Sequence, residues 1–180
     1  MTNHIKIITC FFVITFLSCG SRSQENDNKT LIPLIDFSEV KEFRETKELG
    51  RIVSDYDSIF KQEERRELGN LIHDYNVQTT RQIVVVTIDS LHSYEDIQKF
   101  ATDLANYLGV GTKEENNGLT LVLCKPERKI GIATGLETER VLTDSICKVI
   151  IDSIMIPKFR EGDFYSGMKG GVVELIKNWD

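Results

Sequence analysis

Apolar positions recur at helical spacing in four parts of this 180-residue chain. The first part is SDYDSIFKQEERRELGNLIHDYNVQTT, and the second runs from a capping-box-like start at Ser93 to the glycines at 109 and 111. The third is expected to end at Pro157, and the fourth follows a polar loop, EGDFYSG. The four predicted helices carry the stripes Leu68, Leu71, Ile72, Tyr75; Ile97, Phe100, Ala101, Leu104, Leu108; Leu142, Ile146, Val149, Ile150, Ile154; and Met168, Val172, Leu175, Ile176, Trp179.

Strand-like runs separate these helices. RQIVVVTID is a continuous run of β-branched residues, which is typical of a strand covered on both faces. GLTLVLCKPERKIGIAT predicts a hairpin, because two strand-like runs flank a polar connection at residues 125–128 with Pro126 at a turn position. Residues 51–180 are enough for one domain. The order of elements predicts an α/β protein, a three-layer α/β/α sandwich with a small mixed β-sheet.

The N-terminus has the features of an export signal. An eleven-residue apolar run, Ile7 to Leu17, follows Lys6; a bilayer span needs about 20 residues, whereas a signal-peptide core does not. The sequence FLSCG resembles the lipobox of bacterial lipoproteins, in which the cysteine is lipidated and becomes the mature N-terminus. We predict a lipoprotein-type signal peptide at residues 1–18 and lipidation of Cys19, with a plain secretory signal as the alternative. The expected location is the cell envelope, on a membrane facing the periplasm or exterior.

Residues 19–50 are predicted to be a tether between this anchor and the domain. GSRSQENDNKT is polar and has no apolar residue to bury. The segment after it, LIPLIDFSEVKEFRETKELG, has five apolar residues between positions 31 and 37. The sequence leaves open whether these residues pack on the domain or cover a groove.

Charge argues against nucleic acid as a partner. The chain has 22 basic and 28 acidic residues, a net charge of −6. Loss of residues 1–18 would remove one of these basic residues, Lys6. Nucleic-acid binding depends on clustered cations that neutralise phosphates. The acidic balance is compatible with divalent cations instead.

Side chains suited to nucleophilic catalysis are scarce. The sequence contains neither Gly-x-Ser-x-Gly nor Ser-x-x-Lys, and His73 and His92 each lack a second histidine at ligand spacing. Export would allow Cys124 and Cys147 to pair as a disulfide. Two buried free thiols are the commoner outcome for cysteines that lie between apolar neighbours.

Oxygen-bearing residues gather instead at the predicted ends of helices and strands. Asp55 precedes the first helix, Asn117 precedes a strand, and Gly135, Glu139 and Asp144 follow the next strand. Ca²⁺ takes six to eight oxygen ligands, and loops at the ends of a sheet often bind ligands in α/β folds. The alternative is that these residues only cap helices and form turns.

Several motifs occur together in a known order and spacing. SDYD, RQIVVVTI, LGVGTKEENNGLTLVLCKPERKIGIATG, LTD and IPKFREGDFYSG resemble the TPM domain, a family named after a thylakoid-lumen protein, a photosystem II repair protein and a nematode modulator of acetylcholine receptors. The resemblance covers residues 51–180.

The resemblance implies an α/β/α sandwich, with divalent-cation binding in some members and acid phosphatase activity in others. Aligned on the LTD motif, the family glutamate falls on Glu139, the first glycine of Gly-Tyr-Gly on Gly135 and the second on Glu137, while the family Asp-Asn-Gly is here Asn116-Asn117-Gly118. The family aspartate before the first helix is Asp55.

We therefore expect a lipid-anchored cell-envelope module with an acidic, Ca²⁺-like pocket formed by Asp55, Asn117, Gly135, Glu139 and Asp144. Its expected role is membrane-protein maintenance or assembly, with the membrane and a membrane protein or envelope complex as partners. The alternatives are a metal-dependent, acid phosphatase-like hydrolase that uses the same residues, and a purely protein-binding domain.

Overall fold

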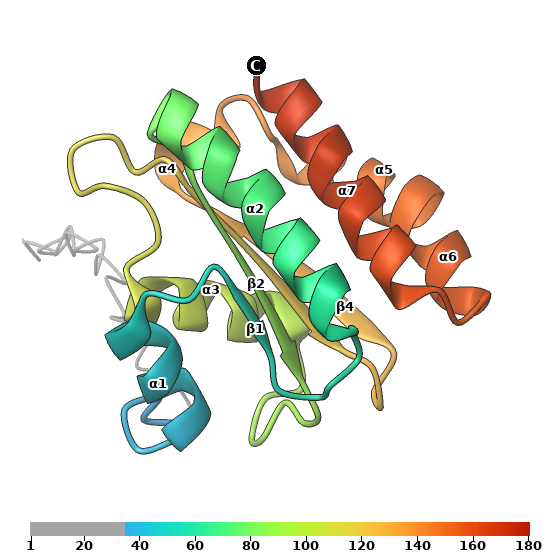
Figure 1. The fold of residues 1–180 in the computed structure, drawn as a ribbon. Helices are drawn as coiled ribbons and strands as arrows, with labels where there is room; N and C mark the ends of the chain where they lie inside the picture. Colours follow the sequence, from blue (N-terminus) through green and yellow to red (C-terminus); the bar gives the residue numbers. More distant parts are fainter. Residues whose placement is uncertain (1–34) are drawn as a thin grey trace, which may run out of the picture. The chain divides into compact units, whose positions relative to one another are not determined.

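The computed structural model describes residues 35–180; the predicted signal peptide, Cys19 and the chain up to residue 34 lie outside the described residues. Figure 1 shows the elements in chain order. They are α1 (Lys41–Leu49), β1 (Val53–Asp55), α2 (Gln62–Thr79), β2 (Gln82–Ile88), α3 (Ile97–Leu108), β3 (Gly118–Cys124), β4 (Lys129–Thr134), α4 (Leu136–Glu139), α5 (Asp144–Ile150), the π-helix η1 (Ile151–Met155), α6 (Ile156–Arg160) and α7 (Phe164–Trp179).

The strands of residues 35–180 form one mixed sheet in the order β1-β2-β3-β4. β1, β2 and β3 are parallel, and β4 runs antiparallel to β3. The carboxyl ends of β1, β2 and β3 therefore share one end of the sheet with the turn at residues 125–128, which we call the turn end. The amino ends of β2 and β3 share the other end with the last residue of β4, and we call this the glycine end after Gly118 and Gly135. The predicted mixed sheet is confirmed.

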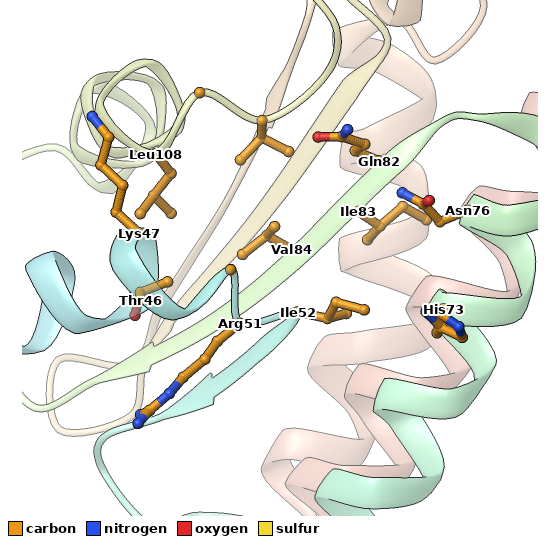
Figure 2. Close-up of a pocket in the computed structure, with 13 residues that line it drawn as sticks. Thr46, Lys47, Arg51, Ile52, His73, Asn76, Gln82, Ile83, Val84 and Leu108 are labelled. Carbon is orange, nitrogen blue, oxygen red and sulfur yellow. The ribbon is translucent and has the colours of Figure 1, made fainter.

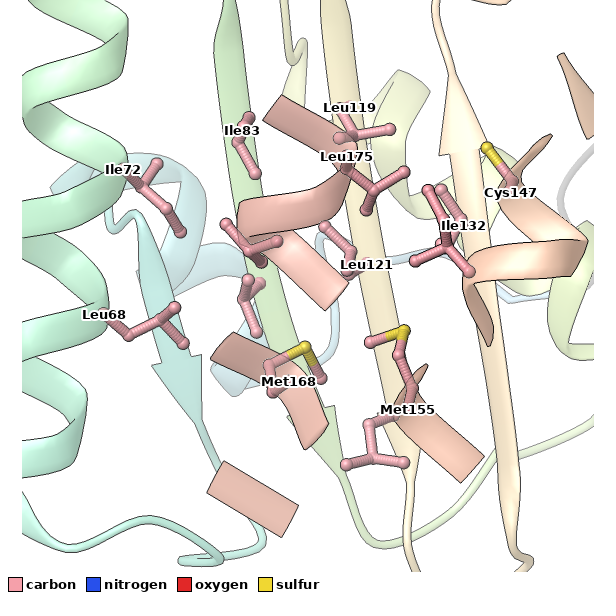
Figure 3. Close-up of a cluster of buried hydrophobic side chains, with 14 of the residues drawn as sticks. Leu68, Ile72, Ile83, Leu119, Leu121, Ile132, Cys147, Met155, Met168 and Leu175 are labelled. Carbon is pink, nitrogen blue, oxygen red and sulfur yellow. The ribbon is translucent and has the colours of Figure 1, made fainter. Parts of the chain in front are cut away.

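Alternate strand residues pack on opposite faces of the sheet. Ile83, Leu119 and Leu121 point toward α2 and α7 (Figure 3), and they share a buried cluster with Ile132 and with Leu175 of α7. Residues offset by one position belong to a second cluster, which α1 and α3 cover from the other face (Figure 1). This alternation confirms the three-layer arrangement of helices around the sheet.

The folded domain begins before residue 51, where the predicted tether ended. Phe37 and Phe43 are 2% and 1% exposed, and both lie against Phe100 of α3 with ring centroids 5.6 and 5.8 Å away. These rings belong to the second cluster. They cover apolar surface of the sheet that α3 alone leaves uncovered. The described part of the predicted tether, residues 35–50, is therefore part of the domain.

α3 starts later than its sequence predicts. Its cap is Asp96, whose carboxylate accepts a hydrogen bond from the backbone N–H of Gln98, and the helix begins at Ile97 instead of near Ser93. The residues before it form a turn that buries Tyr94, whose hydroxyl donates to Asp103 at 2.7 Å. Burial of this ring, which the local cap pattern does not reveal, decides the start of the helix.

Pro157 does not end the third predicted helix. Helical backbone runs from Asp144 to Arg160 through η1, and Pro157 lies in the first turn of α6. Proline lacks an N–H and its ring crowds the carbonyl one turn earlier, and the wider turns of a π-helix relieve that conflict. The chain turns only at residues 161–163, so most of the predicted EGDFYSG loop belongs to α7, which begins at Phe164.

Cys124 and Cys147 are free and buried, as the sequence favoured. None of the helices within residues 35–180 is both long and apolar enough to cross a bilayer.

Candidate functional site at the glycine end of the sheet

A cleft of about 470 Å³ opens at the glycine end of the sheet. One wall is α3, the floor comes from β3 and β4, and the other wall is the chain from Gly135 to the start of α5. We call it the glycine-end cleft. It is lined by Gln98, Thr102, Ala105, Asn106, Val110, Asn116, Gly118, Thr120, Ala133, Thr134, Gly135, Leu136, Glu139 and Asp144.

Close backbone packing shapes this cleft. The Gly135 N–H donates to the Gly118 carbonyl at 2.8 Å, and a Cβ on Gly135 would lie 2.1 Å from the Asn116 carbonyl oxygen. A Cβ on Gly118 would likewise lie 2.1 Å from the Val110 carbonyl oxygen. Both positions require glycine, since no real Cβ approaches an atom so closely. Gly135 thus serves to bring the chain close enough to β3 for the acidic residues after it to face α3.

Two carboxylates line the cleft without a protein partner. Glu139 is the last residue of α4 and Asp144 the first of α5; both are exposed, and neither forms an ion pair or side-chain hydrogen bond within residues 35–180. The neighbouring Glu137 differs, because it pairs with Arg140 at 3.1 Å. The cleft therefore presents two free negative charges.

A hydroxyl group at the floor also lacks a partner. Thr120 of β3 is fully buried, lines the cleft, and its Oγ1 makes no hydrogen bond to any described group. An unpaired buried hydroxyl costs about 1–3 kcal/mol, so its position at the floor of the cleft favours a polar ligand there. The amide of Gln98 is already used, since its Nε2 donates to the Ile132 carbonyl at 2.7 Å.

Asn117, a predicted ligand, turns away from the cleft. Its Oδ1 accepts from the Thr112 N–H at 3.0 Å, and its Nδ2 donates to the Thr80 carbonyl at 3.2 Å and to Glu115 at 2.6 Å. The side chain holds the loop before β3 in place, and the residue is only 6% exposed. Its neighbour Asn116 lines the cleft instead.

Asp55, the other predicted ligand outside the cleft, lies at the turn end. β1 is parallel to β2 and β3, so its carboxyl end is separated from the glycine end by about the length of β3, roughly 20 Å for seven residues. The Asp55 carboxylate has no exposed area and accepts four hydrogen bonds. The structure thus brings Gly135, Glu139 and Asp144 together and leaves Asp55 and Asn117 outside.

A model of the TPM domain matches residues 53–178. The chain belongs to the TPM domain family.

Solved structures agree with this TPM domain in fold. The N-terminal domain of a P. gingivalis protein, solved by NMR, is 26% identical, has a TM-score of 0.65, and the match covers 80% of this chain and 87% of that one. The N-terminal domain of the cg2496 protein from Corynebacterium glutamicum is 17% identical, with a TM-score of 0.57 and coverage of 72% and 80%. The BA42 protein from Bizionia argentinensis is 18% identical, with a TM-score of 0.59 and coverage of 69% and 83%. A comparison with curated proteins finds no match.

The cleft of this TPM domain is lined by oxygen atoms of the types that a hard cation accepts. Ca²⁺ accepts mixed carboxylate, amide, hydroxyl and water oxygens, and the cleft offers Glu139, Asp144, Asn116 and Thr120. Across residues 35–180, however, no group of three or more His, Cys, Asp or Glu side chains is placed to hold a metal ion. Any ion in the cleft would therefore rely on two carboxylates and on neutral oxygens.

Sequence reasoning missed Thr120, although a signal was present. Threonine interrupts the apolar strand GLTLVLC, and this strand is buried on both of its faces. A polar side chain in such a strand needs a reason, and the cleft supplies one.

A second cavity of about 300 Å³ lies over the amino ends of β1 and β2 (Figure 2). It is lined by basic side chains, Lys47 and Arg51, and by His73 of α2, together with amides and apolar groups. Since no carboxylate lines it, this cavity offers a hard cation less than the glycine-end cleft does.

Proposed function

We propose that this TPM domain is a lipid-anchored cell-envelope protein whose glycine-end cleft binds a divalent cation such as Ca²⁺. The observation that carries the proposal is the pair of unpartnered carboxylates, Glu139 and Asp144, in the same cleft as the unpartnered hydroxyl of Thr120. Anchoring through Cys19 follows from the lipobox-like sequence. We propose a role in the maintenance or assembly of membrane proteins, with a membrane protein or envelope complex as partner.

The affinity of such a site for Ca²⁺ would be modest. Affinity for Ca²⁺ rises with the number of charged ligands and the rigidity of the site, and extracellular modules bind at about 10⁻⁴–10⁻³ M. With two exposed carboxylates, we expect this cleft to bind Ca²⁺ in that range. A weak site suits the envelope, where a domain can respond to the surrounding cation concentration without retaining the ion permanently.

The test is a titration of CaCl₂ into the ¹⁵N-labelled chain, followed by amide NMR shifts. We expect the largest shifts at Thr120, Gly135, Glu139 and Asp144, and a loss of binding in Glu139→Gln and Asp144→Asn. Glu137→Gln is the matched control, because Glu137 lies two residues from Glu139 but is paired with Arg140. Shifts that are scattered over the surface, or binding that survives both substitutions, would refute the cation site.

A hydrolase is the second candidate, and the size of the cleft favours it. About 470 Å³ leaves room for a phosphate ester beside an ion. Cys147 is not its nucleophile, since burial and then the nearby Asp144 raise the pKa of this thiol to about 11. Water activated by a bound cation would have to attack instead. We expect p-nitrophenyl phosphate turnover to require added cation and to vanish in Glu139→Gln; turnover that persists in EDTA would exclude this reading.

A further inference from the structure

A third pocket, of about 710 Å³, lies at the turn end of the sheet, opposite the glycine-end cleft. The β3–β4 turn contributes Lys125 and Arg128, and α6 contributes Arg160. Its apolar lining includes Phe159 of α6 and Phe164 of α7. We call it the turn-end pocket. It combines cationic groups at its rim with an aromatic floor.

The charge of this pocket runs against that of the whole chain. The chain carries a net charge of −6, yet no carboxylate lines the turn-end pocket. Lys125, Arg128 and Arg160 are exposed, and none of them forms an ion pair within the described part of the chain. Only Lys129 at the pocket's edge is neutralised, by Glu127 at 2.9 Å. Three uncompensated cations therefore face one cavity.

The aromatic floor is fixed by specific packing. The rings of Phe159 and Phe164 stack with centroids 5.4 Å apart and planes 25° from parallel, and the Lys125 Nζ lies 5.3 Å from the centre of the Phe164 ring. A Cβ on Gly167 would lie 2.6 Å from the Phe159 ring, so glycine at this position lets that ring pack against α7. The floor is thus held in one arrangement before any ligand arrives.

The backbone on both sides of the pocket is unusual. Arg128 adopts a left-handed conformation with φ of 54°, which glycine or asparagine would accept more readily. On the other side, the π-helix η1 directly precedes the segment that carries Phe159 and Arg160. Both features position side chains that line this pocket.

We propose that the turn-end pocket binds the phosphate headgroup of an anionic phospholipid at a membrane surface. Arginine and lysine donate charge-assisted hydrogen bonds to phosphate oxygens, and the Phe159–Phe164 floor would contact the carbon atoms that adjoin the headgroup. An anionic phospholipid joins these two chemistries in one ligand. The predicted anchor at Cys19 would hold the domain beside such lipids.

This proposal does not depend on cation binding in the glycine-end cleft. Because the two sites lie at opposite ends of the sheet, a domain seated on the membrane through its turn end keeps the glycine-end cleft open to solution. The two sites therefore serve different tasks, membrane seating at one end and ligand binding at the other.

The test is co-sedimentation of the full chain with vesicles in EDTA and low salt. Phosphatidylcholine vesicles give the baseline, which includes any contribution of the N-terminus, and vesicles with one quarter phosphatidylglycerol give the gain due to anionic lipid. At about 1 kcal/mol for each cation near the surface, the Arg128→Gly, Arg160→Gln variant is expected to lose roughly 20–30-fold of that gain. Glycine accepts the left-handed turn, so the fold is kept, and circular dichroism checks this.

The matched control is Lys113→Gln with Lys177→Gln, which removes two exposed lysines elsewhere on the domain. We expect the control variant to keep the phosphatidylglycerol gain of the unchanged chain. Equal losses in the two double variants, or no gain in the unchanged chain, would overturn the proposal. Soluble glycerol phosphate carries the same headgroup phosphate without the acyl chains, so at high concentration it is expected to reduce the phosphatidylglycerol gain of the unchanged chain.

Discussion

Replacing Asp55 tests whether its carboxylate supports the fold or binds a cation. Its side chain is 0% exposed, and its two oxygens accept four hydrogen bonds. Oδ1 accepts from the Ile59 N–H at 2.9 Å and from the Thr87 hydroxyl at 2.6 Å, and Oδ2 accepts from the Phe60 N–H at 3.0 Å and from Arg65 at 3.2 Å. The carboxylate thus joins β1 and β2 to the loop that leads into α2.

Asp55→Ala is expected to lower the free energy of unfolding by about 3–5 kcal/mol. The substitution leaves three uncharged donors without an acceptor, each costing about 1–1.5 kcal/mol at the low end of the range for unsatisfied groups. Arg65 adds little, because its side chain is 39% exposed and regains water. A loss of this size is a large part of the roughly 5–15 kcal/mol of a typical domain.

Urea unfolding followed by circular dichroism measures this change, with an unchanged m-value showing that the same surface unfolds. Asp57→Ala is the control, because the neighbouring Asp57 has a buried Oδ2 with no hydrogen bond among the described groups; we expect less than about 1 kcal/mol. The milder Asp55→Asn should leave Ca²⁺ affinity unchanged. A stability change below 1 kcal/mol for Asp55→Ala, or loss of Ca²⁺ binding in folded Asp55→Asn, would refute the structural role.

Two features of the packing and one buried thiol give further expected outcomes. Gly135→Ala should unfold or distort the glycine end, because its Cβ would lie 2.1 Å from the Asn116 carbonyl oxygen; a melting temperature equal to that of the unchanged chain would contradict this. Starting the chain at residue 51 removes Phe37 and Phe43, which are buried at 2% and 1% exposure, and at about 3–5 kcal/mol per phenylalanine this should leave the domain largely unfolded. Its melting curve, compared with that of a chain starting at residue 33, checks the domain boundary. The Cys147 pKa is raised from 9.0 to about 11, so the folded thiol stays neutral while the unfolded thiol ionises; stability should fall as pH rises from about 9 to 11, and less so in Cys147→Ala. Identical pH profiles for the two chains would show that this thiol does not contribute.

Local patterns in the sequence were sufficient for most of the elements. The stripes through Leu68 and Ile72 of α2 and through Met168 and Leu175 of α7 are buried as their spacing predicts, and the hairpin turns where Pro126 indicated. Helical and strand periods report which face of an element is apolar, and a chain must bury that face wherever the element lies. This is why the α/β/α class followed from sequence alone.

Elements whose stability comes from distant contacts were not visible in this way. β1 has three residues and exists because β2 pairs with it, while α1 is held by the rings of α3. Pro157 remains inside helical backbone only because η1 widens the turns before it. In each case tertiary packing outweighs the local preference that the sequence expresses.

The candidate site, too, was predictable from the sequence only in part. Its acidic character and the stretch from Gly135 to Asp144 were evident from the sequence, because a glycine followed by carboxylates after a strand is a local pattern. Strand direction decides which oxygen atoms lie close together. Parallel pairing of β1 with β2 places Asp55 at the turn end, and antiparallel pairing of β4 with β3 brings Gly135 beside Gly118. Strand direction depends on crossover connections between distant segments, and residue spacing along the chain does not encode it.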